Sequence, residues 1–72
     1  MNLYQLGQEY FEGSKKLRVR ALEVMELLKK CDDPEERLLL KRRVYYLVTE
    51  SRDCLETANL LMGYYNKEDE NA

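Results

Sequence analysis

The stretch Cys31-Asp32-Asp33-Pro34-Glu35-Glu36 lies between two long segments of helical periodicity and predicts a sharp turn that joins them. Asp33 is a good N-cap, because its carboxylate can accept hydrogen bonds from the free N–H groups of the next turn. Pro34 suits the first helical position, where no backbone donor is needed. Glu36 follows Asp33 at the spacing of a capping box. The stretch therefore predicts that a second helix starts at Pro34 and that the chain folds as an all-α antiparallel helical hairpin.

The segment before the turn, residues 3–31, predicts one long helix. Its apolar residues recur at helical spacing, and Lys29 and Lys30 lie where a helix exposes its unpaired carbonyl groups. Gly13-Ser14 interrupts the pattern, so a break there, giving a three-helix arrangement, is the alternative. A continuous helix matches the second segment in length, since each residue adds about 1.5 Å. The side expected to face the core carries Leu3, Leu6, Tyr10, Leu17, Ala21, Val24, Leu28 and Cys31.

The segment after the turn, residues 34–65, predicts a second helix of similar length. Its apolar residues alternate three and four positions apart, which is the spacing of antiparallel helix packing. Gly63 or Asn66 is expected to end this helix, and residues 67–72 are expected to form an acidic, frayed tail. Residues 1–66 are thus expected to form one domain. The side of the second helix that is expected to face the first helix carries Leu40, Val44, Leu47, Ser51, Cys54, Ala58, Leu61 and Tyr65.

The composition is typical of a small helical protein that gains stability from self-association. The 72 residues are 36% charged and 44% hydrophobic, and the net charge is -2. A chain of this length rarely builds a core that is sufficient by itself. Cys31 and Cys54 are separated by about 30 Å along the second helix, whereas the Cα atoms of a disulfide lie within about 7 Å of each other. Both cysteines are therefore expected to be reduced thiols in a cytoplasmic protein.

Each helix also carries apolar residues that a two-helix hairpin leaves uncovered. Most of them recur at intervals of seven and fourteen residues, with Leu22 and Tyr64 beside them, outside the sides expected to pack together. Burying a large apolar side chain contributes about 1.5–3 kcal/mol, so these residues predict that two hairpins dimerise into a four-helix bundle. The alternatives are that another protein binds them or that they are scattered exposed hydrophobics. The predicted self-association or partner face comprises Tyr4, Phe11, Leu22, Met25, Leu39, Tyr46, Leu60 and Tyr64.

Basic residues form two clusters, one on each helix. In an antiparallel hairpin that turns at residues 32–33, residue 20 lies near residue 45, so the two clusters meet at mid-hairpin. Phosphate contacts in a nucleic-acid-associated accessory protein are the alternative functional reading. The net charge of -2 and the interleaved carboxylates favour a solvated surface instead. The candidate phosphate contacts are Lys15, Lys16, Arg18, Arg20, Arg37, Lys41, Arg42 and Arg43.

The residues that usually carry catalysis or bind metals are missing or too far apart. The chain has no histidine, the usual general base near neutral pH and the commonest metal ligand. Glu12 with Lys16 and Glu26 with Lys30 have the spacing of helical ion pairs rather than of a catalytic carboxylate pair. The longest uncharged run, residues 57–66, is too short to span a membrane. We therefore expect a non-catalytic interaction or structural module with no cofactor, metal or membrane anchor, whose first partner is a second copy of itself.

Two short motifs stand at the ends of the chain, Asn2-Leu3-Tyr4-Gln5-Leu6-Gly7 with Glu9-Tyr10, and Leu61-Met62-Gly63-Tyr64-Tyr65. These motifs resemble the two ends of short bacterial helical-hairpin proteins to which no activity is assigned. The resemblance spans nearly the whole chain and implies a bacterial, cytoplasmic origin. It implies no catalytic or ligand-binding residue.

Overall fold

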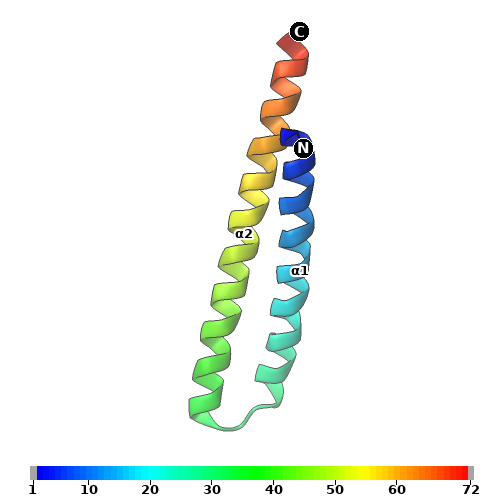
Figure 1. Cartoon of the computed structure of the whole chain (residues 1–72). Helices are drawn as coiled ribbons and strands as arrows, with labels where there is room; N and C mark the ends of the chain where they lie inside the picture. Colours follow the sequence, from blue (N-terminus) through cyan, green and yellow to red (C-terminus); the bar gives the residue numbers. More distant parts are fainter. Residues whose placement is uncertain (1, 72) are drawn as a thin grey trace.

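The chain folds as an all-α antiparallel helical hairpin, as the sequence predicts. The computed structural model describes the backbone of residues 2–71 and the side chains of residues 2–63. Within this range, helix α1 spans Leu3–Lys30 and helix α2 spans Pro34–Asn71 (Figure 1). Helix α1 passes through Gly13 without a break, so the three-helix alternative is wrong. Helix α2 continues to Asn71, beyond the end expected near residue 65, so residues 67–71 of the expected tail are helical.

The start of α1 is held by a capping box that our reading of the sequence missed. The backbone N–H of Gln5 donates to Oδ1 of Asn2 at 2.7 Å, and the N–H of Asn2 donates to Oε1 of Gln5 at 3.2 Å. Two of the N–H groups that lack partners at a helix start are satisfied in this way. The signal was present in the sequence, because Asn2 and Gln5 have the same three-residue spacing as Asp33 and Glu36.

The start of α2 forms only half of the predicted capping box. The N–H of Glu35 donates to Oδ1 of Asp33 at 3.1 Å, which confirms Asp33 as the N-cap. Among the described residues, the Glu36 side chain has no hydrogen bond to the N–H of Asp33. It accepts one instead from Sγ of Cys31, at 3.4 Å. The carboxylate of Glu36 thus ties the turn to α2 by a contact that the capping-box spacing does not predict.

The end of α1 is capped from across the turn. Cys31 has an extended backbone (φ -90°, ψ 125°), so the chain leaves the helix without the glycine that commonly closes a helix end. Nη1 of Arg37 donates to the carbonyl oxygens of Leu28 and Cys31, at 2.9 Å each. The Leu28 carbonyl also accepts from the backbone N–H of Cys31 at 3.3 Å, so the guanidinium adds a second, charged donor there and gives the Cys31 carbonyl a partner. It also places its positive charge at the negative end of α1.

We predict that Arg37→Gln lowers the free energy of unfolding by about 1–2 kcal/mol, because both carbonyl groups lose a charged donor. Arg42→Gln is the matched control, since Arg42 is exposed, and we expect it to change stability by less than about 0.5 kcal/mol. Urea unfolding at one protein concentration measures both. Equal stabilities for the two variants would contradict the capping role of Arg37.

Small residues line the contact between the helices. Gly7, Ser14 and Ala21, spaced seven apart, are buried in α1, and Ala58 is fully buried in α2. Oγ of Ser51 donates to the carbonyl oxygen of Ser14 at 2.9 Å, a hydrogen bond that joins the two helices. This pairing of residues 14 and 51 is the register that places residue 20 beside residue 45, as predicted. We call these residues, Gly7, Ser14, Ala21, Ser51 and Ala58, the small-residue seam.

The seam corrects the side of α1 that we expected to form the core. Leu3 and Tyr10 were expected to be buried, but they are 37% and 40% exposed. Gly7 and Ser14, which apolarity alone does not select, are buried in their place. The larger buried side chains lie toward the turn, where Ala21, Val24 and Leu47 form the core cluster with Leu17, Leu40 and Val44 packed against it.

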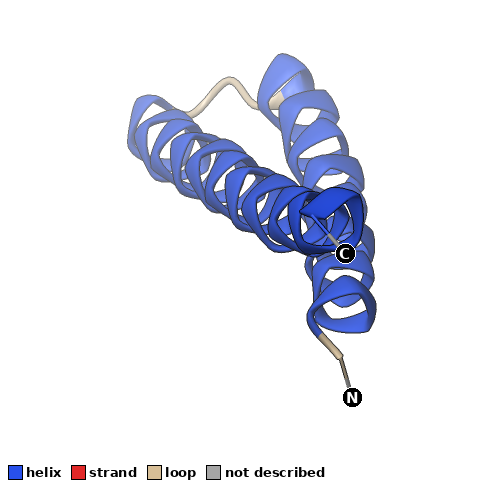
Figure 2. Cartoon of the chain, turned by 90° about the horizontal axis from the view of Figure 1, so that it is seen from above, coloured by secondary structure: helices blue, strands red, loops and turns tan. Residues whose placement is uncertain are grey.

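The arrangement of the helices follows this change in residue size. Figures 1 and 2 show that α1 and α2 lie side by side and diverge toward the turn. The glycine and serine positions of the seam occupy the close end, and the valine and leucine residues of the core cluster occupy the wider end. Because side-chain volume sets the distance between packed helices, this gradient explains the taper of the hairpin.

We predict opposite effects for two glycine substitutions. A Cβ atom on Gly7 would lie 2.7 Å from Cγ of Met62 and 3.2 Å from the backbone oxygen of Ala58. Gly7→Ala should therefore lower the free energy of unfolding by about 1–2 kcal/mol, because the cost of overpacking exceeds the gain in helix propensity. A Cβ atom on Gly13 meets nothing within 4 Å, so Gly13→Ala should raise stability by about 0.5–1 kcal/mol. Urea unfolding tests the pair, and stabilisation by both substitutions would contradict the close approach at Gly7.

Candidate functional site

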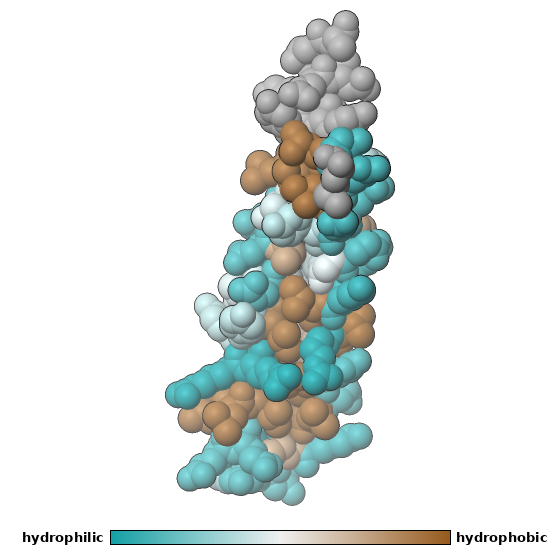
Figure 3. Space-filling view, in the orientation of Figure 1, coloured by the Kyte–Doolittle hydropathy of each residue, from teal (hydrophilic) through white to brown (hydrophobic). Residues whose placement is uncertain are grey.

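The surface of the hairpin is unusually rich in large apolar side chains. Within the described part of the chain, four apolar residues are buried and thirteen large ones are exposed. Figure 3 shows hydrophobic side chains gathered along the line between the helices on one side of the molecule, with hydrophilic ones crossing that line. The exposed set is Leu3, Tyr4, Tyr10, Val19, Leu22, Leu27, Leu38, Leu39, Tyr45, Tyr46, Val48, Leu55 and Leu60.

One groove lies between the helices at the middle of the hairpin. Its floor is formed by Ala21 and Ser51 of the small-residue seam, which leave a depression between larger neighbours. Its charged members are Arg18 and Arg52, one from each helix, and among the described residues neither forms an ion pair. We call this the mid-hairpin groove, lined by Arg18, Ala21, Leu22, Met25, Val48, Ser51, Arg52 and Leu55.

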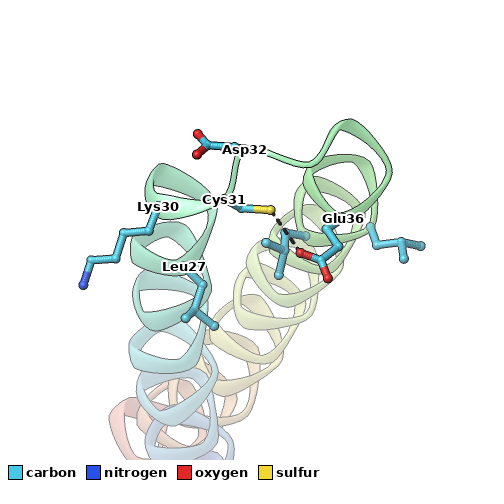
Figure 4. A pocket seen from close by; sticks show the side chains of 7 residues that line it. Leu27, Lys30, Cys31, Asp32 and Glu36 are labelled. Carbon is cyan, nitrogen blue, oxygen red and sulfur yellow. Dashed lines mark hydrogen bonds between the residues drawn. The ribbon is translucent and has the colours of Figure 1, made fainter.

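A second groove lies beside the turn, on the other side of the hairpin. On α1, Arg18 and Leu27 are nine residues apart, and on α2 Leu39 and Val48 are also nine apart. Nine residues make about two and a half helical turns, so the two members of each pair point to opposite sides of their helix. Figure 4 shows Leu27 and Cys31 directed toward α2, whereas Lys30 points away from it. We call this the turn groove, lined by Leu27, Lys30, Cys31, Asp32, Glu36, Leu39 and Leu40.

The predicted self-association face is divided between different sides of the molecule. Leu22 and Met25 line the mid-hairpin groove, and Phe11 lies seven residues, about two helical turns, before Arg18 on the same side of α1. Tyr4 lies another seven residues earlier. The α2 members lie elsewhere: Leu39 lines the turn groove, and Tyr46 and Leu60 are 62% and 74% exposed and line neither groove. The side chain of Tyr64 lies outside the described residues.

The acidic partners of the basic residues differ from those expected. Among the described residues the ion pairs join Lys15 to Glu12 at 3.4 Å, Arg20 to Glu23 at 3.1 Å and Lys29 to Glu26 at 3.1 Å. The glutamates at 12 and 26 therefore pair three residues along the helix, and the predicted four-residue pairs with Lys16 and Lys30 are wrong. Every partner in these pairs is more than half exposed, so each pair contributes only a few tenths of a kcal/mol, or about 0.5 at most.

The predicted phosphate contacts have different roles in the structure. Lys15 lies over the ring of Phe11, 4.5 Å from its centroid, in addition to its ion pair. Arg20 is paired with Glu23, and Arg37 is committed to the end of α1. The nucleic-acid reading stays a prediction. The members that remain exposed, with no ion pair in the described part of the chain, are Lys16, Arg18, Lys41, Arg42 and Arg43.

Searches for other kinds of site gave negative findings. Among the described residues, no group of three or more histidine, cysteine, aspartate or glutamate side chains is placed to hold a metal ion. None of the helices, over the residues described, has the length and apolar character needed to cross a membrane. Comparisons with protein-family models, curated proteins and solved structures found no match. The resemblance to bacterial helical-hairpin proteins therefore stays a prediction.

The thiol of Cys31 lies at the turn groove, and its surroundings change its acidity. Both cysteines are free, and Sγ of Cys31 donates to Glu36 at 3.4 Å (Figure 4). It also donates to the carbonyl oxygen of Asp33 at 3.7 Å. Partial burial, and then the hydrogen bond and negative charge of Glu36, raise the pKa of the Cys31 thiol. The thiolate is the nucleophilic form, so this environment lowers the reactivity of Cys31 near neutral pH.

We predict that Cys31 reacts with iodoacetamide at pH 8 more slowly than an unstructured peptide of the same local sequence. Glu36→Gln should increase its rate by about two- to fivefold, because removing the carboxylate charge lowers the thiol pKa and raises the thiolate fraction. Mass spectrometry of the digested protein separates Cys31 from Cys54, whose rate serves as the internal control. An unchanged rate at Cys31 in the variant would contradict the influence of Glu36.

Proposed function

We propose that this protein is a small, non-catalytic interaction module that works as a homodimer. The observation that carries the proposal is the imbalance between its buried and exposed apolar side chains. Four buried apolar residues form a modest core for two long helices, whereas thirteen large ones are exposed over the described part of the chain. A monomeric soluble protein rarely exposes so much apolar surface without a partner.

The side of the turn groove is the better dimer surface. Leu27 and Leu39 are 58% and 62% exposed there, and burying each contributes up to about 1.5–3 kcal/mol. A smaller groove continues the same side toward the start of α1, because positions 6, 13 and 27 are separated by multiples of seven residues. This groove is lined by Leu6, Glu9, Tyr10, Gly13 and Cys54.

Charge supports the same choice. Lys30 lines the turn groove together with Asp32 and Glu36, so both signs are present on this side. A twofold axis brings the same surface of two copies together, and a surface with both signs can then match opposite charges. The charged residues that line the mid-hairpin groove are both arginines, and arginines of two copies would repel each other across such an axis.

Light scattering during gel filtration, across a dilution series, tests the proposal. We expect wild-type protein to have twice the 8.6 kDa chain mass, and L27E/L39E to shift toward the monomer. Two carboxylates in the apolar contact should weaken association by about a hundredfold or more, because buried charges are left unpaired. Val19→Glu is the control, since Val19 is 55% exposed but lines neither groove.

Two results would contradict the proposal in different ways. A folded wild-type monomer at every concentration would overturn the homodimer. A dimer whose mass is unchanged in L27E/L39E would overturn the choice of side. Circular dichroism of each variant confirms that the helices are retained, which we expect because the substituted side chains are more than half exposed in the hairpin.

A further inference from the structure

We propose that the mid-hairpin groove binds an acidic amphipathic helix of a partner protein. The proposal rests on the proposed function in one respect: the groove belongs to the side that a dimer formed through the turn groove leaves open. Its own evidence is independent and consists of the shape, the polarity and the charge of the groove.

The shape of the groove suits a third helix. Ala21 and Ser51 form a low floor between two helices that run side by side, and larger apolar side chains rise on both sides of it. Helix surfaces pack by inserting a ridge of side chains into such a depression. A helix laid along α1 and α2 would convert the hairpin into a three-helix bundle, which is the helix-in-groove mode of recognition.

The polarity of the floor favours a partner helix whose contacting face is apolar. The one hydroxyl group of the floor, Oγ of Ser51, already donates to the carbonyl oxygen of Ser14 at 2.9 Å. Its donor therefore needs no partner from a ligand. Leu22 is 55% exposed, and Val48 and Leu55 are 37% and 39% exposed, so these side chains are available to pack against incoming leucines.

The charge of the groove selects acidic flanks on the partner helix. Arg18 and Arg52 come from different helices, and the described residues that line the groove include no aspartate or glutamate. The carboxylate of Glu26, one position after Met25, is paired with Lys29. Lys41 lies seven residues before Val48 on the same side of α2 and adds a further positive charge. A helix with carboxylates beside its apolar face matches both the polarity and the charge of the groove.

Other occupants match only one of the two properties. A second copy would place arginines against arginines. A nucleic acid would satisfy the charge, but its phosphate groups would leave the leucine, methionine and valine walls of the groove uncovered. An anionic membrane would also satisfy the charge, but its flat surface does not reach the walls of a groove between two helices. An acidic helix covers the walls and pairs the arginines together, and for that reason we commit to it.

The test uses two synthetic peptides of about 20 residues, roughly 30 Å of helix, with leucines along the face that is to enter the groove. One peptide carries glutamate beside this leucine face, and the other carries lysine at the same positions. Fluorescence anisotropy measures binding of each labelled peptide to the full chain. We expect the glutamate peptide to bind at least about tenfold more tightly than the lysine peptide, and its affinity to fall as salt rises.

A charge reversal supplies the decisive comparison. R18E/R52E should lose at least about tenfold in affinity for the glutamate peptide and should gain affinity for the lysine peptide. K16E/R42E makes the same change in net charge at exposed residues that lie outside the mid-hairpin groove, so it should retain the preference for glutamate. The rescue by the lysine peptide shows that a variant which loses glutamate binding is still folded.

The outcomes separate this proposal from the homodimer. Equal binding of both peptides, no binding of either, or an unchanged preference in R18E/R52E would overturn the acidic-helix proposal. So would binding of single-stranded DNA or of vesicles containing phosphatidylserine that R18E/R52E abolishes while neither peptide binds. The mass of R18E/R52E by light scattering is the separate readout for the dimer, and a shift to monomer would show that the groove is the dimer contact and overturn both assignments.

Discussion

The close approach of α1 and α2 along the small-residue seam governs how the other side chains of the hairpin pack. Gly7 leaves no room for a Cβ atom beside Ala58 and Met62, and Ser51 reaches the backbone oxygen of Ser14. Helices that approach this closely have space between them only for small side chains. Larger buried side chains such as Val24 and Leu47 are therefore confined to the wider end near the turn, and most other large apolar residues lie on the two sides of the contact, half-buried or exposed.

This arrangement of side chains creates the grooves. On each side, a low line of seam or core residues is bordered by leucine, methionine or valine from both helices. The two sides differ in charge, because the turn groove includes both signs and the mid-hairpin groove includes arginine alone. A single hairpin thus presents two apolar surfaces of different chemistry, and the proposals for a dimer and for an acidic helix follow from that difference.

At the turn, the ends of both helices are capped by side chains, some close in sequence and one from the other helix. Asp33 caps the helix that follows it, as its type and position predict. The preceding helix ends without a glycine, and Arg37 of α2 donates to the carbonyl oxygens of Leu28 and Cys31 at that end. Glu36, released from the expected capping box, accepts from Cys31 and raises the pKa of that thiol. The short turn is stabilised by side chains from both of the elements that it joins.

The hairpin, the position of the turn, the N-cap at Asp33 and the register of the two helices could all be predicted from the sequence. These features depend on residues a few positions apart and on helix length, which periodicity and capping signals report directly. The packing of the helices, in contrast, was needed to show that Gly7 and Ser14 are buried in the contact while Tyr10 is 40% exposed. Apolarity ranks tyrosine above glycine, but the distance between the helices selects by volume.

The packing of the helices also places each surface residue on one side of the hairpin and selects its contacts. Sequence reasoning placed Leu22, Met25 and Leu39 on one candidate face, but the pairing of the helices puts Leu39 in a different groove from the other two. Arg37 belonged to a basic cluster in the sequence and became a cap for α1 only when the turn brought it to Leu28. Such roles depend on which atoms of the second helix meet the first, and no local pattern contains that information.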